Sequence, residues 1–363
     1  MRVAMIGHKR IPGRGGGVEV VVEELSTRLA SMGVEVIAYN RKTRGENSPS
    51  EYRGVRLVDV PTPDSKKLNA VVYSYLATVR AVIDGADVIH YHALGPAASL
   101  WLANLLGKKV VVTVHGLNYK TPKWKGFGAR YIKFGERLTA RCADEVIVLS
   151  HSIKRYFKEE YGRDVRYIPN GISMPEKAED DSVLDRFRLR GKDFLLCVSR
   201  LVPGKGLEIL IDAFRKLDTD ALLVIAGDSE HVDDFKENLF ERASGDERIV
   251  FTRNLEKEDL SALYANAKLF VFPSEAEGMP MALLEAMWFD CPCLVSDIPE
   301  NTEVTNGAGQ TFPVGDSEGL ATSLSALLLS PPERRDTRTM VRREHDWWSV
   351  AEDTEKVYEG LIA

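Results

Sequence analysis

Residues 269–287 read LFVFPSEAEGMPMALLEAM, and this stretch is the strongest indicator of the fold. Leu269–Phe272 has the length and composition of a buried strand, and the apolar-rich segment after the loop has the pattern of a helix. Pro280 suits the first turn of that helix, because proline lacks the amide that a first turn leaves unbonded. A strand, a short polar loop and a helix in this order form one unit of a parallel α/β sheet.

Two glutamates in this stretch are separated by seven residues. Glu277 falls on the loop at the mouth of the predicted helix, where a carboxylate can accept hydrogen bonds from sugar hydroxyls. Glu285 falls inside the helix, from where it can reach a ribose diol. The alternative for Glu285 is a solvated helix face, but the flanking Leu284 and Ala286 are apolar. We therefore predict that Glu285 is not fully exposed.

Short apolar runs alternate with amphipathic stretches along the whole chain, and this alternation predicts parallel sheets covered by helices. The predicted strands are Val3–Ile6, Val34–Tyr39, Val88–Tyr91, Val110–Val114, Glu145–Leu149, Phe194–Val198, Leu222–Ala226, Ile249–Phe251, Leu269–Phe272 and Cys293–Val295. The fold class is therefore α/β, with two doubly wound, Rossmann-like domains. We expect the domains to face each other across a ligand cleft near the carboxyl ends of the strands.

The clearest domain boundary is Pro169-Asn170-Gly171, a turn signal that a polar, acidic stretch follows. It predicts a first domain over residues 1–170 and a second domain that begins at residue 171. Near the end of the chain, Trp347–Ile362 has the pattern of a helix that is too apolar on one face to be a solvated tail.

The 363 residues carry a net charge of −6, and that charge is unevenly distributed. Residues 1–170 have a net charge of +11, whereas residues 171–363 have −17. Either the opposite charges help the two domains associate, or the basic half faces an anionic partner. The acidic second half and the lack of a recognition motif argue against nucleic-acid binding.

Other features of the sequence exclude further classes. No apolar run approaches the roughly 18 residues that suggest a membrane-spanning helix. The first residues predict a strand and not a signal peptide. Four cysteines show no zinc-site spacing and are too few for a disulfide scaffold. We therefore expect a reducing, cytoplasmic setting.

A glycine-containing loop follows the first predicted strand of each half. In Gly13–Glu19, glycines before a helix allow backbone amides to approach an anion. In Ser199–Gly206, Arg200 and Lys205 add two cations at the start of the next helix, which suits a diphosphate. The alternative to anion binding is a flexible turn in the first loop and two unrelated surface cations in the second. Their matching positions favour a shared role beside one cleft.

The first loop does not match the dinucleotide fingerprint. G-x-G-x-x-G requires a glycine where Val18 stands, and the second strand ends in Asn40-Arg41, where an NAD site needs an acidic residue. Arg41 alone would favour an NADP-linked oxidoreductase, which the failed fingerprint makes remote. There is no Walker motif and no Asp-x-Asp pair at a strand end. We therefore expect no cofactor and no metal.

Histidines also occur near the ends of predicted strands. His90 and His92 fall on one face of a strand, and metal binding would need a third ligand, which no motif supplies. We favour a structural or cleft-lining role for the pair. His8, near the end of the first strand, could line the acceptor side.

Taken together, these motifs resemble the family-four glycosyltransferases of the GT-B fold, a retaining, metal-independent group that uses nucleotide-sugar donors. The resemblance extends over nearly the whole chain. It rests on Gly15–Glu19, His115-Gly116, Pro169-Asn170-Gly171, Arg200 with Lys205-Gly206, Glu277 to Glu285, Asp297-Ile298-Pro299-Glu300 and the closing tryptophan-containing helix. It implies a nucleotide-sugar-binding domain over residues 171–345. It also implies that residues 346–363 cross back to the first, acceptor-binding domain.

The resemblance implies a role for each matching residue. Arg200 and Lys205 would bind the diphosphate and stabilise the leaving nucleotide, and His115 would lie at the sugar near the reacting carbon. Glu277 would hold the donor sugar and Glu285 the ribose. The other residues implied for donor binding are Gly16, Gly17, Asn254, Gly278 and Met279.

Two departures from the family pattern stand out. The family often has Glu-Gly-x-Gly, and Pro280 replaces the second glycine, which removes one amide that could face the donor. Asp290 stands where a helix-ending glycine is common, and we interpret this change as structural.

The resemblance implies a hexosyltransferase that moves a sugar from a nucleotide-diphosphate sugar to an acceptor hydroxyl with retention. The acceptor would be a lipid-linked saccharide or polysaccharide precursor at the cytoplasmic membrane face. No convincing nucleophile lies near His115 in the sequence, so we favour front-face substitution. The alternative is a nucleotide-sugar epimerase of the same fold, and the basic first domain argues against it.

Lys120–Arg141 is rich in basic residues, with Glu136 as its only acid and aromatic residues interleaved. From Phe127 onward it can form an amphipathic helix with a basic face. A packed helix with a solvated basic side is the alternative. We predict peripheral, salt-sensitive attachment to an anionic membrane surface on the inner face of the cell membrane. The residues predicted for this surface are Lys120, Lys123, Lys125, Arg130 and Lys133.

Overall fold

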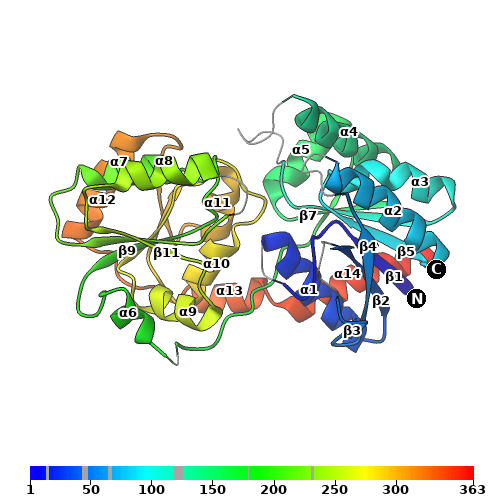
Figure 1. The fold of residues 1–363 in the computed structure, drawn as a ribbon, viewed down its shortest axis with the longest axis horizontal. Coiled ribbons are helices and arrows are strands. Elements are labelled where there is room, and N and C mark those ends of the chain that lie inside the picture. Colours follow the sequence, from blue (N-terminus) through cyan, green and yellow to red (C-terminus); the bar gives the residue numbers. More distant parts are fainter. Residues whose placement is uncertain (14–15, 43–47, 64–67, 118–125, 179, 230–232) are drawn as a thin grey trace. The chain divides into compact units, whose positions relative to one another are not determined.

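The computed structural model describes the chain except for residues 14–15, 43–47, 64–67, 118–125, 179 and 230–232. The chain divides into two compact units (Figure 1). Unit 1 contains the described residues from Met1 to Gly171 and from His345 to Ala363. Unit 2 contains the described residues from Ile172 to Glu344. Each unit is a Rossmann-like sheet covered by helices, which confirms the predicted α/β class.

The sheet of unit 1 has the strand order β3-β4-β2-β1-β5-β6-β7-β8. Its strands are β1 (Arg2–Ile6), β2 (Glu35–Lys42), β3 (Glu51–Tyr52), β4 (Val55–Pro61), β5 (Val88–His92), β6 (Lys109–Val114), β7 (Glu145–Val148) and β8 (Arg166–Tyr167). Its helices are α1 (Gly17–Ser31), α2 (Asn69–Ile83), η1 (Pro96–Ser99), α3 (Leu100–Leu105), α4 (Phe127–Cys142), α5 (His151–Tyr161) and α14 (Trp347–Ile362). All strand pairs are parallel except β3 with β4.

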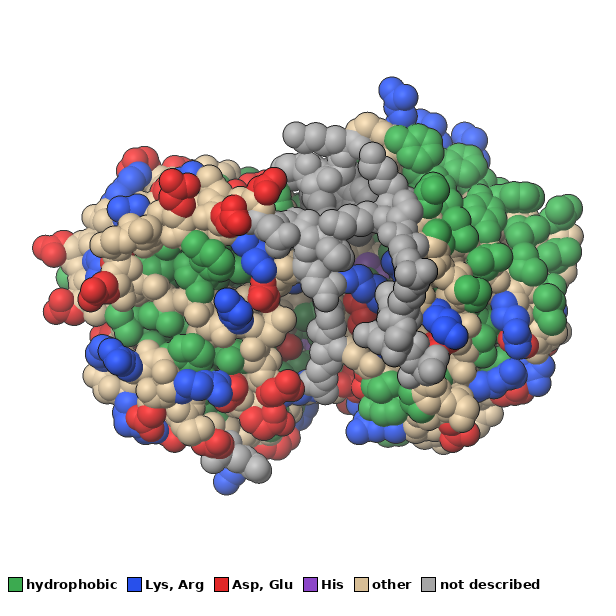
Figure 2. All heavy atoms as spheres, viewed as in Figure 1, with side chains coloured by type: hydrophobic (Ala, Val, Ile, Leu, Met, Phe, Trp, Pro, Cys, Tyr) green, Lys and Arg blue, Asp and Glu red, His purple; other side chains and the backbone are tan. Residues whose placement is uncertain are grey.

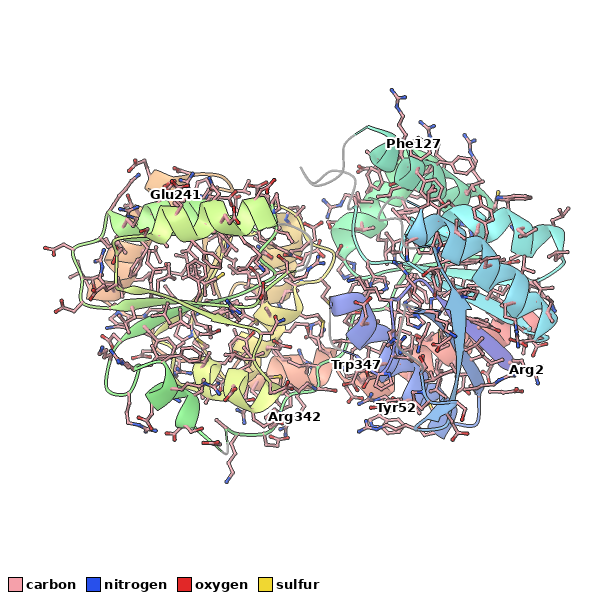
Figure 3. All side chains as sticks on the ribbon, in the orientation of Figure 1. Arg2, Tyr52, Phe127, Glu241, Arg342 and Trp347 are labelled. Carbon is pink, nitrogen blue, oxygen red and sulfur yellow. The ribbon has the colours of Figure 1, made fainter. Side chains whose placement is uncertain are left out.

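The core of unit 1 explains why these segments pack as they do. On one face of the sheet, Ala4 and Ile6 of β1 join one buried cluster with Tyr73 and Ala77 of α2. Leu100 of α3 and Ile132 of α4 belong to the same cluster. Helices α1 and α14 pack against each other, and Trp347 at the start of α14 is buried (Figure 3).

The sheet of unit 2 is entirely parallel, with the order β11-β10-β9-β12-β13-β14. Its strands are β9 (Phe194–Val198), β10 (Leu222–Ala226), β11 (Ile249–Arg253), β12 (Leu269–Phe272), β13 (Cys293–Ser296) and β14 (Gln310–Phe312). Its helices are α6 (Ser182–Arg186), α7 (Leu207–Arg215), α8 (Asp233–Ala243), α9 (Lys257–Asn266), α10 (Met281–Trp288), α11 (Pro299–Thr305), α12 (Ser317–Leu329) and α13 (Arg338–Glu344).

The helix after β12 begins one residue later than predicted. Pro280 has φ −78° and ψ 93° and occupies the N-cap of α10, so it is not in the first helical turn. Its carbonyl oxygen accepts hydrogen bonds from the amides of Leu283 and Leu284, as an N-cap carbonyl does. The loop that carries Glu277 therefore runs up to the helix entrance.

Candidate active site

The loop after β9 in unit 2 places two cations at the start of α7. Arg200 is exposed, and the Lys205 side chain is 16% exposed. Gly206 is the N-cap of α7 with φ 67°, and a Cβ on it would lie 2.1 Å from the carbonyl oxygen of Pro273. Only glycine therefore allows this loop to press against the segment that follows β12. The cations and the positive end of α7 suit a diphosphate.

The loop after β12 brings Glu277 to Lys205. The Lys205 ammonium donates to Glu277 Oε1, and the Ser274 hydroxyl donates to the same oxygen at 2.6 Å. The amide of Glu275 donates to the carbonyl oxygen of Gly204 at 3.0 Å, which ties the two loops together. Sequence reasoning did not single out Ser274, although it stands three residues before Glu277. The three side chains form one polar cluster at the carboxyl ends of neighbouring strands.

Glu285 lies within α10 and is partly buried, as predicted. The hydroxyl of Tyr264, on α9, donates to Glu285 Oε2 at 2.9 Å. Burial first, and then the nearby Glu285 carboxylate, raise the pKa of Tyr264 well above its ordinary value. Tyr264 therefore remains a proton donor to Glu285. Nothing in the sequence pattern pointed to Tyr264, because it lies on a different helix.

The other residues predicted for donor binding lie around these loops. Asn254 follows β11 directly and is exposed. Gly278 and Met279 are buried just before α10, and the Met279 residue is only 9% exposed. The buried side chain of Met279 is poorly placed to receive a ligand. A role in donor binding would therefore involve the backbone of these two residues.

In unit 1, Gly16 and Gly17 stand at the entrance of α1. Gly16 is the N-cap of α1, and an added Cβ at Gly17 would meet none of the described residues within 4 Å. Glu19, one turn into the helix, accepts a hydrogen bond from the amide of Lys9 at 2.9 Å. Glu23 accepts from the amide of Gly13 at 3.0 Å. Helix α1 thus binds the backbone of Lys9 and Gly13, which precede it.

His115 follows β6 and pairs with a second histidine. Its Nε2 lies 3.1 Å from Nδ1 of His92, at the end of β5. Burial lowers the pKa of His115 to about 4 and that of His92 well below its ordinary value. One ring must donate and the other accept, so the pair shares one proton between the two atoms. His92 therefore fixes the orientation of His115, a role that the sequence left open.

His90 has a structural role, one of the two that the sequence favoured. Its Nδ1 lies 2.6 Å from the hydroxyl of Tyr358 on α14, and its Nε2 lies 2.7 Å from Oγ1 of Thr113. Both ring nitrogens are thus occupied inside unit 1. His8 is also buried, with Nε2 2.9 Å from Oδ1 of Asn40. Burial lowers the pKa of His8 to about 4.

The basic surface predicted around α4 needs one correction. Lys120, Lys123 and Lys125 lie outside the described residues, and Arg130 is exposed on α4. Lys133 is not part of an exposed basic surface, because its ammonium donates to Glu136 Oε1 at 2.8 Å and to the Tyr156 hydroxyl at 2.7 Å. Glu136 is fully buried, and a buried carboxylate needs such partners.

Two features are absent from the part of the chain that the structure describes. No group of three or more His, Cys, Asp or Glu side chains among them is arranged to hold a metal ion. No helix that the structure describes is long and apolar enough to cross a membrane.

Residues 15–174 match the family described as Glycosyltransferase Family 4, and residues 185–344 match Glycosyl transferases group 1. The phosphatidyl-myo-inositol mannosyltransferase of Mycobacterium leprae is 26% identical over an alignment that covers 95% of this chain and 93% of that protein. Sucrose-phosphate synthase from Thermosynechococcus elongatus superposes with a TM-score of 0.87 at 19% identity, over 99% of this chain and 98% of that one. HepE from Anabaena, solved with UDP and glucose, superposes with a TM-score of 0.80 at 17% identity, over 99% and 100% of the two chains. At these identities the two structures establish a shared fold.

Proposed function

Because the chain belongs to the family-4 glycosyltransferases of the GT-B fold, we propose that it transfers a sugar from a nucleotide-diphosphate sugar to an acceptor hydroxyl with retention at the anomeric carbon. The observation that carries this proposal is the polar cluster of Lys205, Glu277 and Ser274 at the entrance of α7. It sets a cation for the diphosphate beside a carboxylate for the sugar.

The contact between Lys205 and Glu277 suggests how the donor binds. A diphosphate is a stronger partner for an ammonium than one carboxylate, because it offers more charge and more acceptor oxygens. Donor binding would therefore draw Lys205 onto the phosphates and release Glu277 toward the hydroxyls of the sugar. Glu285, oriented by Tyr264, would accept hydrogen bonds from the ribose. Asn254 and the backbone of Gly278 and Met279 would complete the donor site.

We propose front-face substitution as the mechanism. The bond between the anomeric carbon and the phosphate oxygen breaks while the acceptor oxygen bonds to the same face of that carbon. The acceptor proton passes to the departing phosphate oxygen. Arg200, Lys205 and the positive end of α7 stabilise the charge that develops on the diphosphate. The Gly16–Gly17 entrance of α1 would face the diphosphate, and His115 would lie at the sugar.

The acceptor we propose is a glycolipid or a lipid-linked saccharide, which the enzyme would reach from the cytoplasm at the inner face of the cell membrane. The name of the mycobacterial relative, a phosphatidyl-myo-inositol mannosyltransferase, supports a lipid acceptor. The basic character of the first half of the chain supports peripheral attachment to an anionic membrane surface. The exposed Arg130 would take part in that attachment.

A panel of nucleotide-diphosphate sugars, each incubated with the protein and candidate acceptors, tests this function. We expect release of the nucleoside diphosphate from at least one donor, and an anomeric configuration in the product that matches the donor by NMR. An inverted product would contradict retention. An epimer of the donor with the diphosphate still attached would favour the alternative, a nucleotide-sugar epimerase. None of the contacts described above supports that alternative.

A further inference from the structure

The outer face of α2, α3 and α4 in unit 1 is unusually apolar. Figure 2 shows hydrophobic side chains gathered over these helices. Ile83 of α2 is 73% exposed, Leu105 of α3 is 74% exposed and Phe127 of α4 is 79% exposed. Phe127 lies at the outer end of α4 (Figure 3). Single exposed apolar side chains are ordinary, but a contiguous group of them marks an interaction surface.

Helix α2 is apolar on both of its sides. Its inner side buries Tyr73, Ala77 and Ala81 against the sheet. Its outer side exposes Leu76, Val79 and Ile83. These three recur at intervals of three and four residues, so they form one stripe along the helix. A helix at the surface of a soluble domain normally carries polar residues on that side, and an apolar stripe there is expected where something covers it.

Contacts between the helices place the apolar stripe of α2 on the same face of unit 1 as α3 and α4. The rings of Tyr75 on α2 and Trp101 on α3 meet edge to face at 6.3 Å, and Trp101 Nε1 donates to the Tyr75 hydroxyl at 3.4 Å. Gly135 brings α4 close to η1 and the residues before it, since an added Cβ would lie 1.9 Å from the carbonyl oxygen of Leu94 and 3.3 Å from the amide nitrogen of Ala98. Trp101 is itself 44% exposed, so an aromatic residue lies within the face.

The charges on this face are of one sign. Helices α2 and α3 contain no acidic residue, and the acid of α4, Glu136, is buried. On the outer side of α4, Arg130, Arg137 and Arg141 alternate with Phe127 and Phe134, and all five are exposed. At the end of α2, Asp84 is covered by Arg80, which donates to it at 3.0 Å.

We infer that the outer face of α2, α3 and α4 enters the surface of an anionic lipid bilayer. Leu76, Ile83 and Leu105 would lie among the acyl chains, and the arginines of α4 would contact the phosphates of the head groups. A second copy of this chain fits less well, because a symmetric contact would set arginines against arginines. This inference rests on the proposed membrane attachment and adds apolar insertion to its electrostatic part.

Labelled cysteines test the insertion directly. In a Cys142→Ser background, which removes the exposed cysteine and leaves the three buried ones, Ile83→Cys and Leu105→Cys are each labelled with a polarity-sensitive fluorophore. Leu329→Cys on α12 of unit 2 is the matched control, because Leu329 is 85% exposed outside this face. With vesicles of phosphatidylcholine and phosphatidylglycerol, we expect severalfold brighter emission from positions 83 and 105. Brominated acyl chains should quench that emission, and position 329 should not change.

Binding variants separate insertion from electrostatic attachment. The double variant Leu76→Asn with Ile83→Asn should partition into these vesicles about tenfold or more weakly. Each of its two substitutions removes apolar surface that lipid would bury. Arg137→Glu with Arg141→Glu should weaken this partitioning and reduce its dependence on salt. Thermal unfolding and transfer to a soluble acceptor serve as controls in both variants.

Three results would overturn the inference. Vesicle binding without brightening at positions 83 and 105 would leave an electrostatic attachment alone. Brightening that needs no lipid and grows with protein concentration would identify a second copy of the chain as the occupant. No vesicle binding, with brightening on addition of an acidic protein, would identify a protein partner. Glycosyl transfer to a soluble acceptor would persist in each case and would keep the proposed chemistry separate.

Discussion

The Tyr264 hydroxyl donates a 2.9 Å hydrogen bond to Glu285 Oε2 and so joins α9 to α10 in unit 2. Because Tyr264 remains protonated, this bond holds the carboxylate in one orientation, and a ribose diol would meet a preformed acceptor. The hydrogen bond also explains how α10, which is mostly apolar, can carry the Glu285 carboxylate. A partly buried carboxylate needs a hydrogen-bond donor, and Tyr264 supplies one.

The first prediction is that Glu285→Gln weakens binding of free nucleoside diphosphate by about ten- to a hundredfold, the range for one hydrogen bond to a charged group. Tyr264→Phe should weaken binding less, because it leaves the carboxylate in place. Isothermal titration calorimetry measures both. Glu275→Gln is the matched control, since Glu275 is exposed on the loop before α10. Unchanged affinity in the Glu285 variant would defeat the ribose role.

The second prediction concerns the two cations before α7. Arg200→Ala and Lys205→Ala should each lower kcat by about a hundredfold or more, as the loss of one group that stabilises developing charge does. KM for the donor should change far less, because the charge develops mainly in the transition state. Steady-state release of nucleoside diphosphate measures both constants, with Lys192→Ala on the exposed loop before β9 as control. Near-normal turnover in both variants would show that the cations do not act on the leaving group.

The third prediction separates Glu277 from Glu285. Glu277→Gln should mainly reduce turnover, because the side chain would contact the sugar and not the nucleotide. Affinity for free nucleoside diphosphate should hold or rise, since the Lys205 ammonium would lose a competing carboxylate. Calorimetry and turnover are compared with those of the Glu275→Gln control. Equal turnover in the two variants would contradict a role at the sugar.

The sequence predicted the strands well where hydrophobic runs are long, and it missed β3, β4, β8 and β14. β4 spans seven residues, but Arg56 and Asp59 interrupt its apolar residues, so it has no continuous apolar run. β3, β8 and β14 span two, two and three residues, too few to show a period. Asp290 was interpreted as structural, and the geometry agrees with this reading. Its φ of 53° is one that glycine favours, and its Oδ1 accepts from the amides of Thr337 and Arg338 at 2.9 Å, which compensates for the strain.

Side-chain contacts across elements were beyond the reach of sequence reasoning. Lys133 carries a charge like its neighbours, and only the packing of α4 on α5 shows that it turns toward Glu136 and Tyr156. Tyr264 and His92 were missed as partners for the same reason, because each meets its candidate residue from a different element. Spacing along one element finds residues on that element, and the neighbours that orient them depend on the tertiary fold.

The fourth prediction is that the reaction needs no divalent metal. In the proposed mechanism, Arg200 and Lys205 would supply the positive charge that a metal ion would otherwise bring to the diphosphate. Turnover should therefore be unchanged in excess chelator, and added magnesium or manganese should not raise it. The measurement is nucleoside diphosphate release before and after chelation and dialysis. Activity that disappears with the chelator and returns with either metal would contradict this prediction.

The last prediction concerns the stability of unit 1 between pH 7.5 and pH 5. Burial lowers the pKa of His8 and of His115 to about 4, whereas both should titrate near the ordinary value of about 6.5 in the unfolded chain. Between these values the unfolded state binds more protons, so the free energy of unfolding falls as the pH falls, by up to about 1.4 kcal/mol per pH unit for each histidine. The full stability is present above about pH 6.5, and most carboxylates do not titrate until lower pH.

Hydrogen exchange of β1 and β6 peptides, followed by mass spectrometry, measures how the free energy of unfolding of this unit changes with pH. His8→Asn should reduce that slope, whereas His151→Asn, at an exposed position on α5, should not. A slope that is the same in both variants would show that buried neutral histidines do not set the acid sensitivity of this unit.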